Sequence, residues 1–520
     1  MTIMKHGKEP ESTVVTATIP STVEASVATS TAASSWRTEH GLTDQHISNG
    51  RLFNPDIAPR TGKGNWGTGS LFNWWMSAWH SLGGYAMAVG FMALGLNGWQ
   101  ALLGMAIGMI AMWGASNLMG VAGQRVGVPF PVLARMSFGV NGANIPAFLR
   151  AIVAVCWYGI QTFLASQAVL ILTLKIFPGL EPLNNTMFLG LSQLGWMCLL
   201  LLWAAQLFVL HRGMETVRRL SDFAGPTIWI AMIALALWTL SRADWKLDWN
   251  YTMSDQVLTG GAAVVGVLSV ASLVLAYMAG PMLNFADFTR MSSSESSVRR
   301  GNALGLLLNG IAFALISVII GIASAEVYGA AVTDPILLLG DLDSITLLLV
   351  ATLAVSVAQV GVNIICNFVS ASFDFAHLAP KAITFKIGGV ITAVLAIVVM
   401  PWHMYSSPVI INYFLGGVGA LVGPLFGILI ADFYLVKKSK FIVKDLYTSA
   451  PQGAYHYSGG FNVPYIAAFL LCGTVTLIVA LVPAFSALAS FSWPIGVTLG
   501  FLSVLAIKAL SSKKEIVEAI

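Results

Sequence analysis

Charged side chains are scarce in this chain of 520 residues, of which 10% are charged and 57% are hydrophobic. A soluble globular domain carries about a quarter charged residues. The shortage excludes an ordinary soluble protein, because too few charges remain to cover a surface that faces water. The net charge of +4 is small and needs no nucleic-acid partner to explain it.

Residues for covalent or metal chemistry are also few. The four cysteines lie within long apolar runs, and no pair has the spacing of metal ligands, so we expect small buried side chains without disulfides. No Ser/His/Asp order or phosphate-cradling glycine loop occurs in a suitable setting. The sequence therefore predicts neither an enzyme nor a bound cofactor.

Long apolar runs dominate what is present. About 20 apolar residues suffice to span the hydrocarbon core of a bilayer. The sequence thus predicts an all-α integral membrane protein with twelve transmembrane helices. The runs lie at 70–96, 99–121, 147–174, 187–209, 222–241, 257–281, 302–327, 344–369, 384–401, 407–435, 462–484 and 488–511.

The basic residues indicate the orientation of these runs. Placing the N-terminus inside leaves Lys175, Arg242 and Lys246 in outer loops, so 24 of the 27 Lys and Arg residues are on the inner side. By the positive-inside rule, both termini are cytoplasmic in a plasma or inner membrane. We expect the lysines after the tenth run, at 437–444, to contact lipid headgroups.

The order of the runs suggests an organisation in units. Twelve spans allow two inverted five-helix repeats followed by two helices, with the first helix of each repeat broken at mid-membrane. Ser77, His80 and Ser81 precede Gly83-Gly84 in the first run, and Ala279-Gly280-Pro281 interrupts the sixth. Ordinary kinks would explain the same residues, because Gly and Pro are common in membrane helices.

We expect five segments. They are a disordered cytoplasmic tail (1–65), the first repeat (66–245), the second repeat (246–436), the last two helices (437–511) and a cytoplasmic C-terminus (512–520).

Trp157 and Gln161 lie one turn apart on the same face of the third run. An amide left unpaired in hydrocarbon costs on the order of several kcal/mol, so Gln161 must face protein or a solute. A flat ring beside a neutral amide suits a flat, uncharged molecule that forms hydrogen bonds. The pair therefore indicates a binding site for such a solute.

Three other polar residues within the runs leave alternatives open. Asn363 and Asn367 share a face of the eighth run, where amides commonly bond neighbouring helices. For Asn363 that role and solute contact are equally compatible with the pattern. His80 could take part in proton coupling, although a neutral imidazole bonded to a backbone carbonyl is the commoner arrangement.

Seven strings occur in order between about residues 70 and 510. They are Gly127 to Arg135, Ser137 to Val140 with Gly142 to Pro146, Trp157 to Gln161, Asn284 to Arg290, Asn363 with Asn367, Pro401-Trp402, and Gly423-Pro424 with Ala431 to Tyr434. Together they resemble the nucleobase:cation symporter family, which carries nucleobases, hydantoins and allantoin. The resemblance implies two inverted five-helix repeats plus two helices, with the solute between helices 1, 3, 6, 8 and 10.

The resemblance also assigns roles to individual residues. Trp157 would stack on the heterocycle, and Gln161 and Asn367 would bond its carbonyl and N–H groups. Ser81 stands where the family often has a longer amide.

On the sixth helix this chain departs from the family. The aromatic that usually covers the other face of the ring is replaced by Met278, whose neighbour is Tyr277. Either the tyrosine takes over that contact or the ring is covered on one face only, and a polarizable methionine can pack on a ring.

The coupling-ion site implied by the resemblance is incomplete. The carbonyls of Ser77 and His80 would serve as ligands, and the positions on the eighth run are Ala358, Gly361 and Val362. Two positions that carry hydroxyls in sodium-coupled members have none here, and a hard cation requires several oxygen ligands. Protons are therefore the expected coupling ion.

The sequence as a whole predicts a secondary active transporter that imports a neutral planar nitrogen heterocycle such as uracil, allantoin, hydantoin or cytosine by alternating access. Sodium-coupled symport of the same solutes is one alternative. A channel or facilitator without ion coupling is another, although its pore would show repeated polar or small stripes. A sensor that binds without transport is the third.

Overall fold

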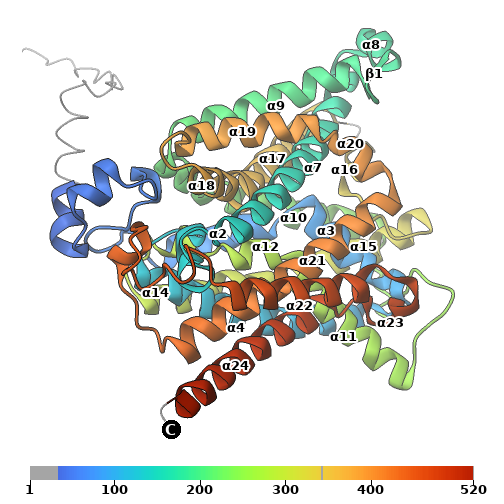
Figure 1. Cartoon of the computed structure of the whole chain (residues 1–520). Coiled ribbons are helices and arrows are strands. Elements are labelled where there is room, and N and C mark those ends of the chain that lie inside the picture. Colours follow the sequence, from blue (N-terminus) through green and yellow to red (C-terminus); the bar gives the residue numbers. More distant parts are fainter. Residues whose placement is uncertain (1–32, 341–343, 519–520) are drawn as a thin grey trace, which may run out of the picture.

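The computed structural model describes residues 33–340 and 344–518, and these form a bundle of long helices (Figure 1). In this part of the chain, ten helical segments are long and apolar enough to cross a membrane. They lie in α4 (Gly98–Val126), α7 (Asn144–Ile176), α9 (Gln193–His211), α10 (Met214–Arg242), α11 (Gly260–Tyr277), α14 (Glu295–Gly301) with η5 (Asn302–Leu308) and α15 (Asn309–Tyr328), α17 (Ile345–Asn363) with η6 (Ile364–Phe368) and α18 (Val369–Leu378), α21 (Pro408–Ala431) with η7 (Asp432–Val436), α22 (Val463–Leu481), and α24 (Ser492–Glu518).

Two shorter apolar segments complete the set of spans. The first span consists of α2 (Thr68–Trp79), α3 (Leu82–Gly90) and η3 (Phe91–Leu94), and the ninth is α19 (Phe385–Val398). With the ten long segments they account for the twelve predicted spans, numbered here in chain order. The connecting elements are η1 (Gln45–Asn49), η2 (Pro55–Ile57), α5 (Phe130–Leu133), α6 (Arg135–Phe138), η4 (Pro178–Leu180), α8 (Glu181–Asn185), the hairpin β1 (Met187–Phe188) and β2 (Leu191–Ser192), α12 (Ala279–Leu283), α13 (Ala286–Thr289), α16 (Pro335–Gly340), α20 (Pro401–Ser406), η8 (Val443–Tyr447), η9 (Pro483–Phe485) and α23 (Ser486–Ala489).

Span 1 is interrupted at its centre, as predicted. α2 ends at Trp79, and His80 and Ser81 leave the helical conformation, with Ser81 extended at φ −129° and ψ 158°. The Oγ of Ser81 then caps α3 by accepting a hydrogen bond from the Gly84 N–H at 2.9 Å. A Cβ at Gly84 would lie 2.7 Å from the Trp79 carbonyl oxygen, so this tight restart requires glycine.

Span 6 is interrupted at the corresponding position. α11 ends at Tyr277, Met278 adopts φ −96° and ψ 10°, and the short helices α12 and α13 follow. Pro281 lies within α12 and lacks the N–H that would continue the hydrogen-bond ladder. The broken-helix interpretation is therefore confirmed at both places.

Spans 2 and 6 pack against each other through glycines. A Cβ at Gly104 would lie 2.7 Å from the Val267 carbonyl oxygen, and one at Gly108 would lie 2.7 Å from that of Ala271. Small residues allow two helix backbones to approach closely. Span 7 packs on span 1 in the same way that span 2 packs on span 6, which is the reciprocal pairing expected of two inverted repeats.

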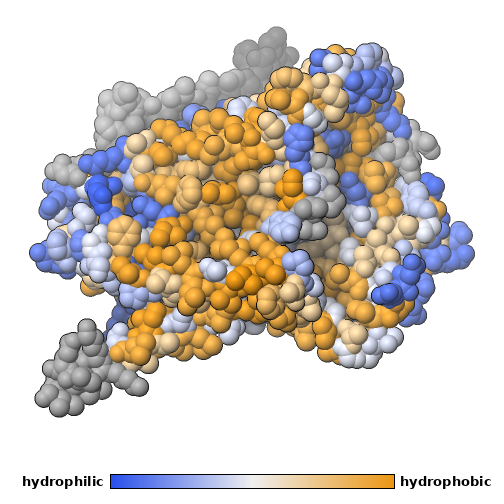
Figure 2. Space-filling view, turned by 45° about the vertical axis from the view of Figure 1, so that its right-hand side comes forward, coloured by the Kyte–Doolittle hydropathy of each residue, from blue (hydrophilic) through white to orange (hydrophobic). Residues whose placement is uncertain are grey.

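The lateral surface of the bundle is apolar. Figure 2 shows a broad hydrophobic band across one face, with hydrophilic residues gathered toward its two ends. Large side chains such as Leu103, Leu201 and Ile230 are exposed on this surface. Such an exposed apolar area fits contact with lipid tails.

The segment before span 1 differs from the disordered tail expected over residues 1–65. Residues 33–40 form a helix, and Ile57 is fully buried against the bundle. The Tyr447 hydroxyl donates to the Ile57 carbonyl at 2.7 Å, and the Asn54 amide donates to the Pro380 carbonyl at 2.8 Å. Apolar residues scattered through the segment, without helical periodicity, cover the ends of several spans. Residues 1–32 and 519–520 of the predicted termini lie outside the described chain.

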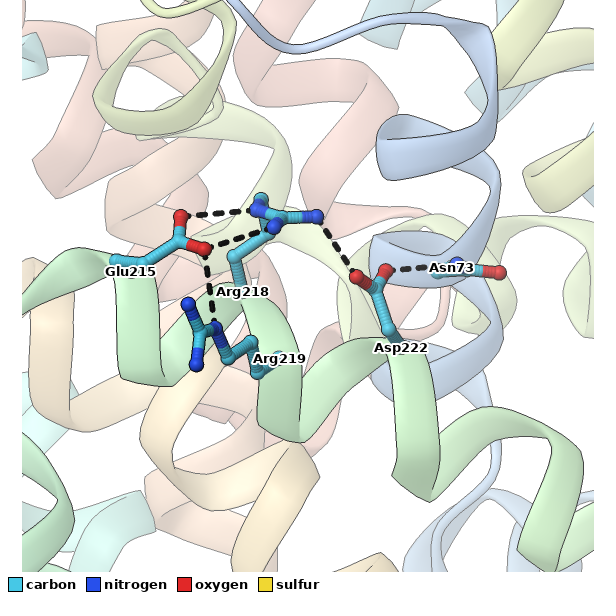
Figure 3. Close-up of polar contacts among 5 residues, drawn as sticks. All are labelled: Asn73, Glu215, Arg218, Arg219 and Asp222. Carbon is cyan, nitrogen blue, oxygen red and sulfur yellow. Dashed lines mark hydrogen bonds and ion pairs between the residues drawn. The ribbon is translucent and has the colours of Figure 1, made fainter. Parts of the chain in front are cut away.

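The start of α10 is tied to α2 by a polar network (Figure 3). The Asn73 amide donates to Asp222 at 2.7 Å, and Arg218 bonds Asp222 at 2.9 Å. Arg218 and Arg219 also bond Glu215, at 2.8 and 3.1 Å. The network thus joins the first half of span 1 to span 5.

Candidate functional site

A small cavity lies between the interruptions of spans 1 and 6 and the middles of spans 3 and 8. Its volume is about 30 Å³, which is room for roughly two water molecules and too little for a heterocycle. The cavity in this structure is therefore too narrow to hold a heterocycle. The residues lining it are Ala78, Trp157, Gln161, Tyr277, Met278, Pro281, Val362, Cys366 and Asn367.

Aromatic rings form one side of the cavity. Trp157 meets Tyr277 edge to face, with ring centroids 6.0 Å apart, and also contacts Phe414 of span 10 at 5.9 Å. The Tyr277 hydroxyl lies 3.0 Å from the Ser81 Oγ, which ties the end of α11 to the interruption of span 1. Tyr277 and Met278 both line the cavity, whereas Ser81 supports the tyrosine from behind.

Gln161 lies in a chain of amides that reaches span 1. The Gln359 Nε2 donates to the Gln161 Oε1 at 2.5 Å. The Gln359 Oε1 in turn accepts a hydrogen bond from the Leu82 N–H, at 2.9 Å. Both glutamines are buried, and Gln161 lines the cavity. The first backbone N–H of α3 is therefore satisfied by span 8, which in turn orients the amide of span 3.

Asn367 lies in a second chain of amides. Its Nδ2 donates to the Asn363 Oδ1 at 3.0 Å. The two N–H groups of the Asn363 Nδ2 are shared among three acceptors, the Tyr158 carbonyl at 3.0 Å, the Thr162 Oγ1 at 2.9 Å and the Gln206 Oε1 at 2.8 Å. Of the two alternatives for Asn363, the structure favours a tie between spans 3, 4 and 8. Asn367 lies in front of it and faces the cavity.

Of the positions considered for the coupling ion, Val362 lines the cavity. Ser77, His80, Ala358 and Gly361 lie beside it. The fully buried His80 ring packs between Trp229 and Phe313, at centroid distances of 5.2 and 4.7 Å. Neither ring nitrogen has a well-formed hydrogen bond to a described residue. An imidazolium in these apolar surroundings would lack a counter-charge, so the neutral ring fits better.

The two ion-coupling candidates on span 8, Ala358 and Gly361, have no side-chain oxygen. Ala358 and Gly361 are buried, and a Cβ at Gly361 would lie 2.9 Å from the Ala224 Cβ of span 5. Gly361 therefore serves close helix packing. Ser77, the remaining candidate, is buried near the end of α2. Within the described ranges, no group of three or more His, Cys, Asp and Glu residues could hold a metal ion.

Sequence reasoning missed Gln359, together with Gln206 and Thr162 in the second chain of amides. Gln359 lies four residues before Asn363 and eight before Asn367, so all three share one face of span 8. This spacing was the available signal.

A cluster of buried charges lies between the cavity and the face that carries residues 33–66. The Arg150 Nε donates to the Asn284 Oδ1 at 3.1 Å, and its Nη2 donates to the Cys366 carbonyl at 2.7 Å. The Asn284 amide donates to Asp287 at 3.0 Å. Asp374 is fully buried within electrostatic reach of Arg150 and Asp287, and neither of its oxygens has a hydrogen-bond partner among the described residues.

Comparison with known proteins identifies relatives over most of the chain. The model of the family described as permeases for cytosine/purines, uracil, thiamine and allantoin matches residues 60–502. An allantoin permease of Bacillus subtilis is 32% identical over 469 residues, which cover 89% of this chain and 94% of that protein. A purine-uracil permease of Arabidopsis thaliana is 31% identical over 87% of this chain and 75% of its own length.

A solved structure has the same fold. The transporter Mhp1 of the nucleobase-cation-symport-1 family, in a closed conformation with bromovinylhydantoin bound, superposes with a TM-score of 0.71 at 22% identity. The match covers 89% of this chain and 96% of that one. The predicted architecture of two inverted repeats plus two helices is thereby confirmed. These relatives are permeases and transporters, not enzymes, and the chain belongs to the family of permeases for cytosine/purines, uracil, thiamine and allantoin.

Proposed function

We propose that this protein imports a neutral planar nitrogen heterocycle, such as allantoin, uracil, hydantoin or cytosine, by proton-coupled alternating access across the plasma or inner membrane. The observation that carries the proposal is the cavity between the two interrupted spans, where Trp157 stands beside the amides of Gln161 and Asn367. The name of the Bacillus subtilis relative makes allantoin the first solute to test.

Alternating access is supported by the small size of the cavity. A volume of about 30 Å³ admits no heterocycle, so the spans around it must separate for a solute to enter and leave. The interruptions at Ser81 and Met278 divide spans 1 and 6 into halves. In transporters built from inverted repeats, rocking of one bundle against the other opens such a site to one side at a time.

Proton coupling is supported by the absence of a hydroxyl group at two positions of span 8. Gly361 and Val362 have no hydroxyl, and the space at Gly361 is closed by Ala224 of span 5. A sodium ion would lose two ligands there, whereas a proton requires a single basic atom. Sodium coupling is the second candidate, because the family resemblance includes sodium-coupled members.

Purified protein in vesicles tests the proposal. Uptake of labelled allantoin, uracil, hydantoin and cytosine is measured with sodium or choline outside, at several external pH values. We expect uptake above the outside concentration that rises with an inward proton gradient and is unchanged in choline. Strong sodium dependence with an unchanged pH response would contradict proton coupling, and uptake that only equilibrates would indicate a facilitator.

The orientation is proposed from the charge bias of the sequence. With both termini cytoplasmic, the face that carries residues 33–66 and the lysines at 437–444 is the inner one. Labelling of single introduced cysteines at Ser254 and Ser439 by an impermeant reagent in intact cells tests this. We expect labelling at position 254 only, and the reverse pattern would invert the orientation.

A further inference from the structure

The two chains of amides determine which end of each amide faces the cavity. A backbone N–H only donates, and a backbone carbonyl only accepts. Each chain ends on one such group, the Leu82 N–H in the first and the Tyr158 carbonyl in the second. The fixed role of this backbone group determines which atom donates and which accepts in each hydrogen bond between it and the cavity.

In the first chain the Leu82 N–H requires an oxygen, so the Oε1 of Gln359 faces span 1. The Nε2 of Gln359 must then face Gln161, which supplies its Oε1 as the acceptor at 2.5 Å. The oxygen of Gln161 is thereby used within the protein. Its Nε2 remains for the cavity, so span 3 presents a hydrogen-bond donor.

In the second chain the Tyr158 carbonyl requires a donor, so the Nδ2 of Asn363 faces span 3. Gln206 reinforces this direction by accepting from the same nitrogen at 2.8 Å. The Oδ1 of Asn363 then accepts from the Nδ2 of Asn367, at 3.0 Å. Asn367 is left with its Oδ1 for the cavity, so span 8 presents a hydrogen-bond acceptor.

We propose that Gln359 is a positioning residue for substrate specificity, because it turns the Gln161 amide so that a donor on span 3 and an acceptor on span 8 meet a lactam edge, a ring carbonyl next to a ring N–H. The carbonyl accepts from the Gln161 Nε2, and the N–H donates to the Asn367 Oδ1. Gln359 acts through Gln161 and does not line the cavity. This inference rests on the proposed function and specifies the solute class of the same site.

The selectivity arises because a mismatched solute leaves a buried polar group unpaired. Each unpaired group lowers the affinity of the protein for the solute by about 10- to 100-fold. A methyl group on the ring nitrogen removes the donor for Asn367, and a thiocarbonyl is a poor acceptor for Gln161. Both changes keep the ring flat and neutral, so its stacking on Trp157 is retained.

The test measures binding of uracil, hydantoin and allantoin to purified protein by calorimetry at pH 5.5. Uracil and hydantoin are compared with their 1-methyl, 3-methyl and thio derivatives. We expect wild type to disfavour at least one N-methyl derivative and one thio derivative of each by about 10-fold. Equal binding of all derivatives would overturn the lactam selection.

The role of Gln359 is tested by two variants. Gln359→Met keeps the length of the side chain but removes both bonds, so the Gln161 amide is free to turn and the thio discrimination should fall to about twofold or less. Gln359→Glu should retain it at pH 5.5, because a carboxyl in such a buried position is neutral and can accept from Leu82 while donating to Gln161. Gln167→Met is the matched control, since Gln167 lies on the same helix as Gln161 and its amide bonds the neighbouring Ser166.

The outcomes separate the two proposals. If wild type binds none of the heterocycles, the proposed function fails. If wild type discriminates, and a folded Gln359→Met protein, monitored by gel filtration and thermal melting, discriminates equally well, the positioning role of Gln359 is overturned while the proposed function stands. Loss of discrimination in a folded Gln359→Glu protein would also overturn it.

Discussion

The cavity and the charged cluster beside it bury polar groups in opposite ways. Around the cavity the polar side chains are neutral amides, and each has a partner in the protein or faces the cavity. In the cluster, Arg150, Asp287 and Asp374 are buried as ionisable groups, and the Asp374 carboxyl has no hydrogen bond to the described chain. The difference indicates that the cavity is suited to select a solute by the direction of its hydrogen bonds, whereas the stability of the cluster depends on the balance of its charges.

This contrast bears on the charge of the solute. A buried neutral amide without a partner costs about 1–3 kcal/mol, whereas a buried ion that loses its counter-charge costs about 3–5 kcal/mol. A cavity lined by Trp157, Gln161 and Asn367 holds no charge that could balance an ionic solute. A neutral heterocycle therefore suits the cavity, and changes in the cluster should have the larger effect on stability.

The largest expected effect is on removal of Arg150 from the cluster, since Asp374 has Arg150 as its neighbouring cation while Asp287 also has Arg290. Arg150→Met leaves Asp287 and Asp374 buried without it, which should cost about 3–5 kcal/mol of folding free energy. Thermal melting of purified protein measures the loss. The double variant Arg150→Met with Asp374→Asn should regain a good part of it, because one uncompensated carboxyl is then gone. Equal melting temperatures for the single and double variants would show that the two groups are not coupled.

The next effect concerns the aromatic side of the cavity. Trp157→Ala removes the ring on which we propose that the heterocycle stacks, and stacking of a base on an aromatic side chain contributes about 1–3 kcal/mol. We expect affinity to fall about 10- to 100-fold and thermal stability to change little, since Trp157 is only partly buried. Calorimetry with the tightest-binding heterocycle measures this, and Trp157→Phe should keep part of the affinity. Unchanged affinity in Trp157→Ala would remove this residue from the site.

Variants of Asn367 and Asn363 distinguish a side chain that faces the cavity from one that joins helices behind it. Asn367→Ala should weaken binding by about 1–3 kcal/mol with little loss of stability, because its Oδ1 faces the cavity. Asn363→Ala should lower both, since it leaves the buried Gln206 Oε1 without its donor, whereas the Tyr158 carbonyl keeps the Thr162 hydroxyl. Binding and melting of the two variants are measured side by side. Equal stability losses would contradict the different roles.

The sequence predicted the lining of the cavity better than the support behind it. Trp157, Gln161 and Asn367 could be found because polar or flat side chains stand out within apolar runs. The partners of each amide could not be found, since they depend on the distances between spans. Gln359 was therefore missed although it shares a face with Asn367.

Span 6 and the segment before span 1 show the same difference between what a local sequence pattern reveals and what contacts between distant segments determine. The resemblance left open whether Tyr277 takes over the contact of the missing aromatic or the ring is covered on one face only. Both Tyr277 and Met278 line the cavity, because the helix is interrupted between them. The order of residues 33–65 could not be predicted, because their stability comes from contacts with distant loops at Pro380 and Tyr447 and not from a local period.

The smallest expected effect lies in the polar network between α2 and α10. Its groups resemble the charged cluster in composition, but the side chains of Arg218 and Asp222 are 31% and 33% exposed, so water competes for every bond. Exposed pairs contribute about 0–1 kcal/mol. Asn73→Ala should therefore lower stability by no more than about 1 kcal/mol in thermal melting, with Asn250→Ala in an exposed loop as the control. A loss as large as that of Arg150→Met would mean that the bond between Asn73 and Asp222 is desolvated in the membrane, and exposure to solvent would then no longer explain why the two charged regions differ.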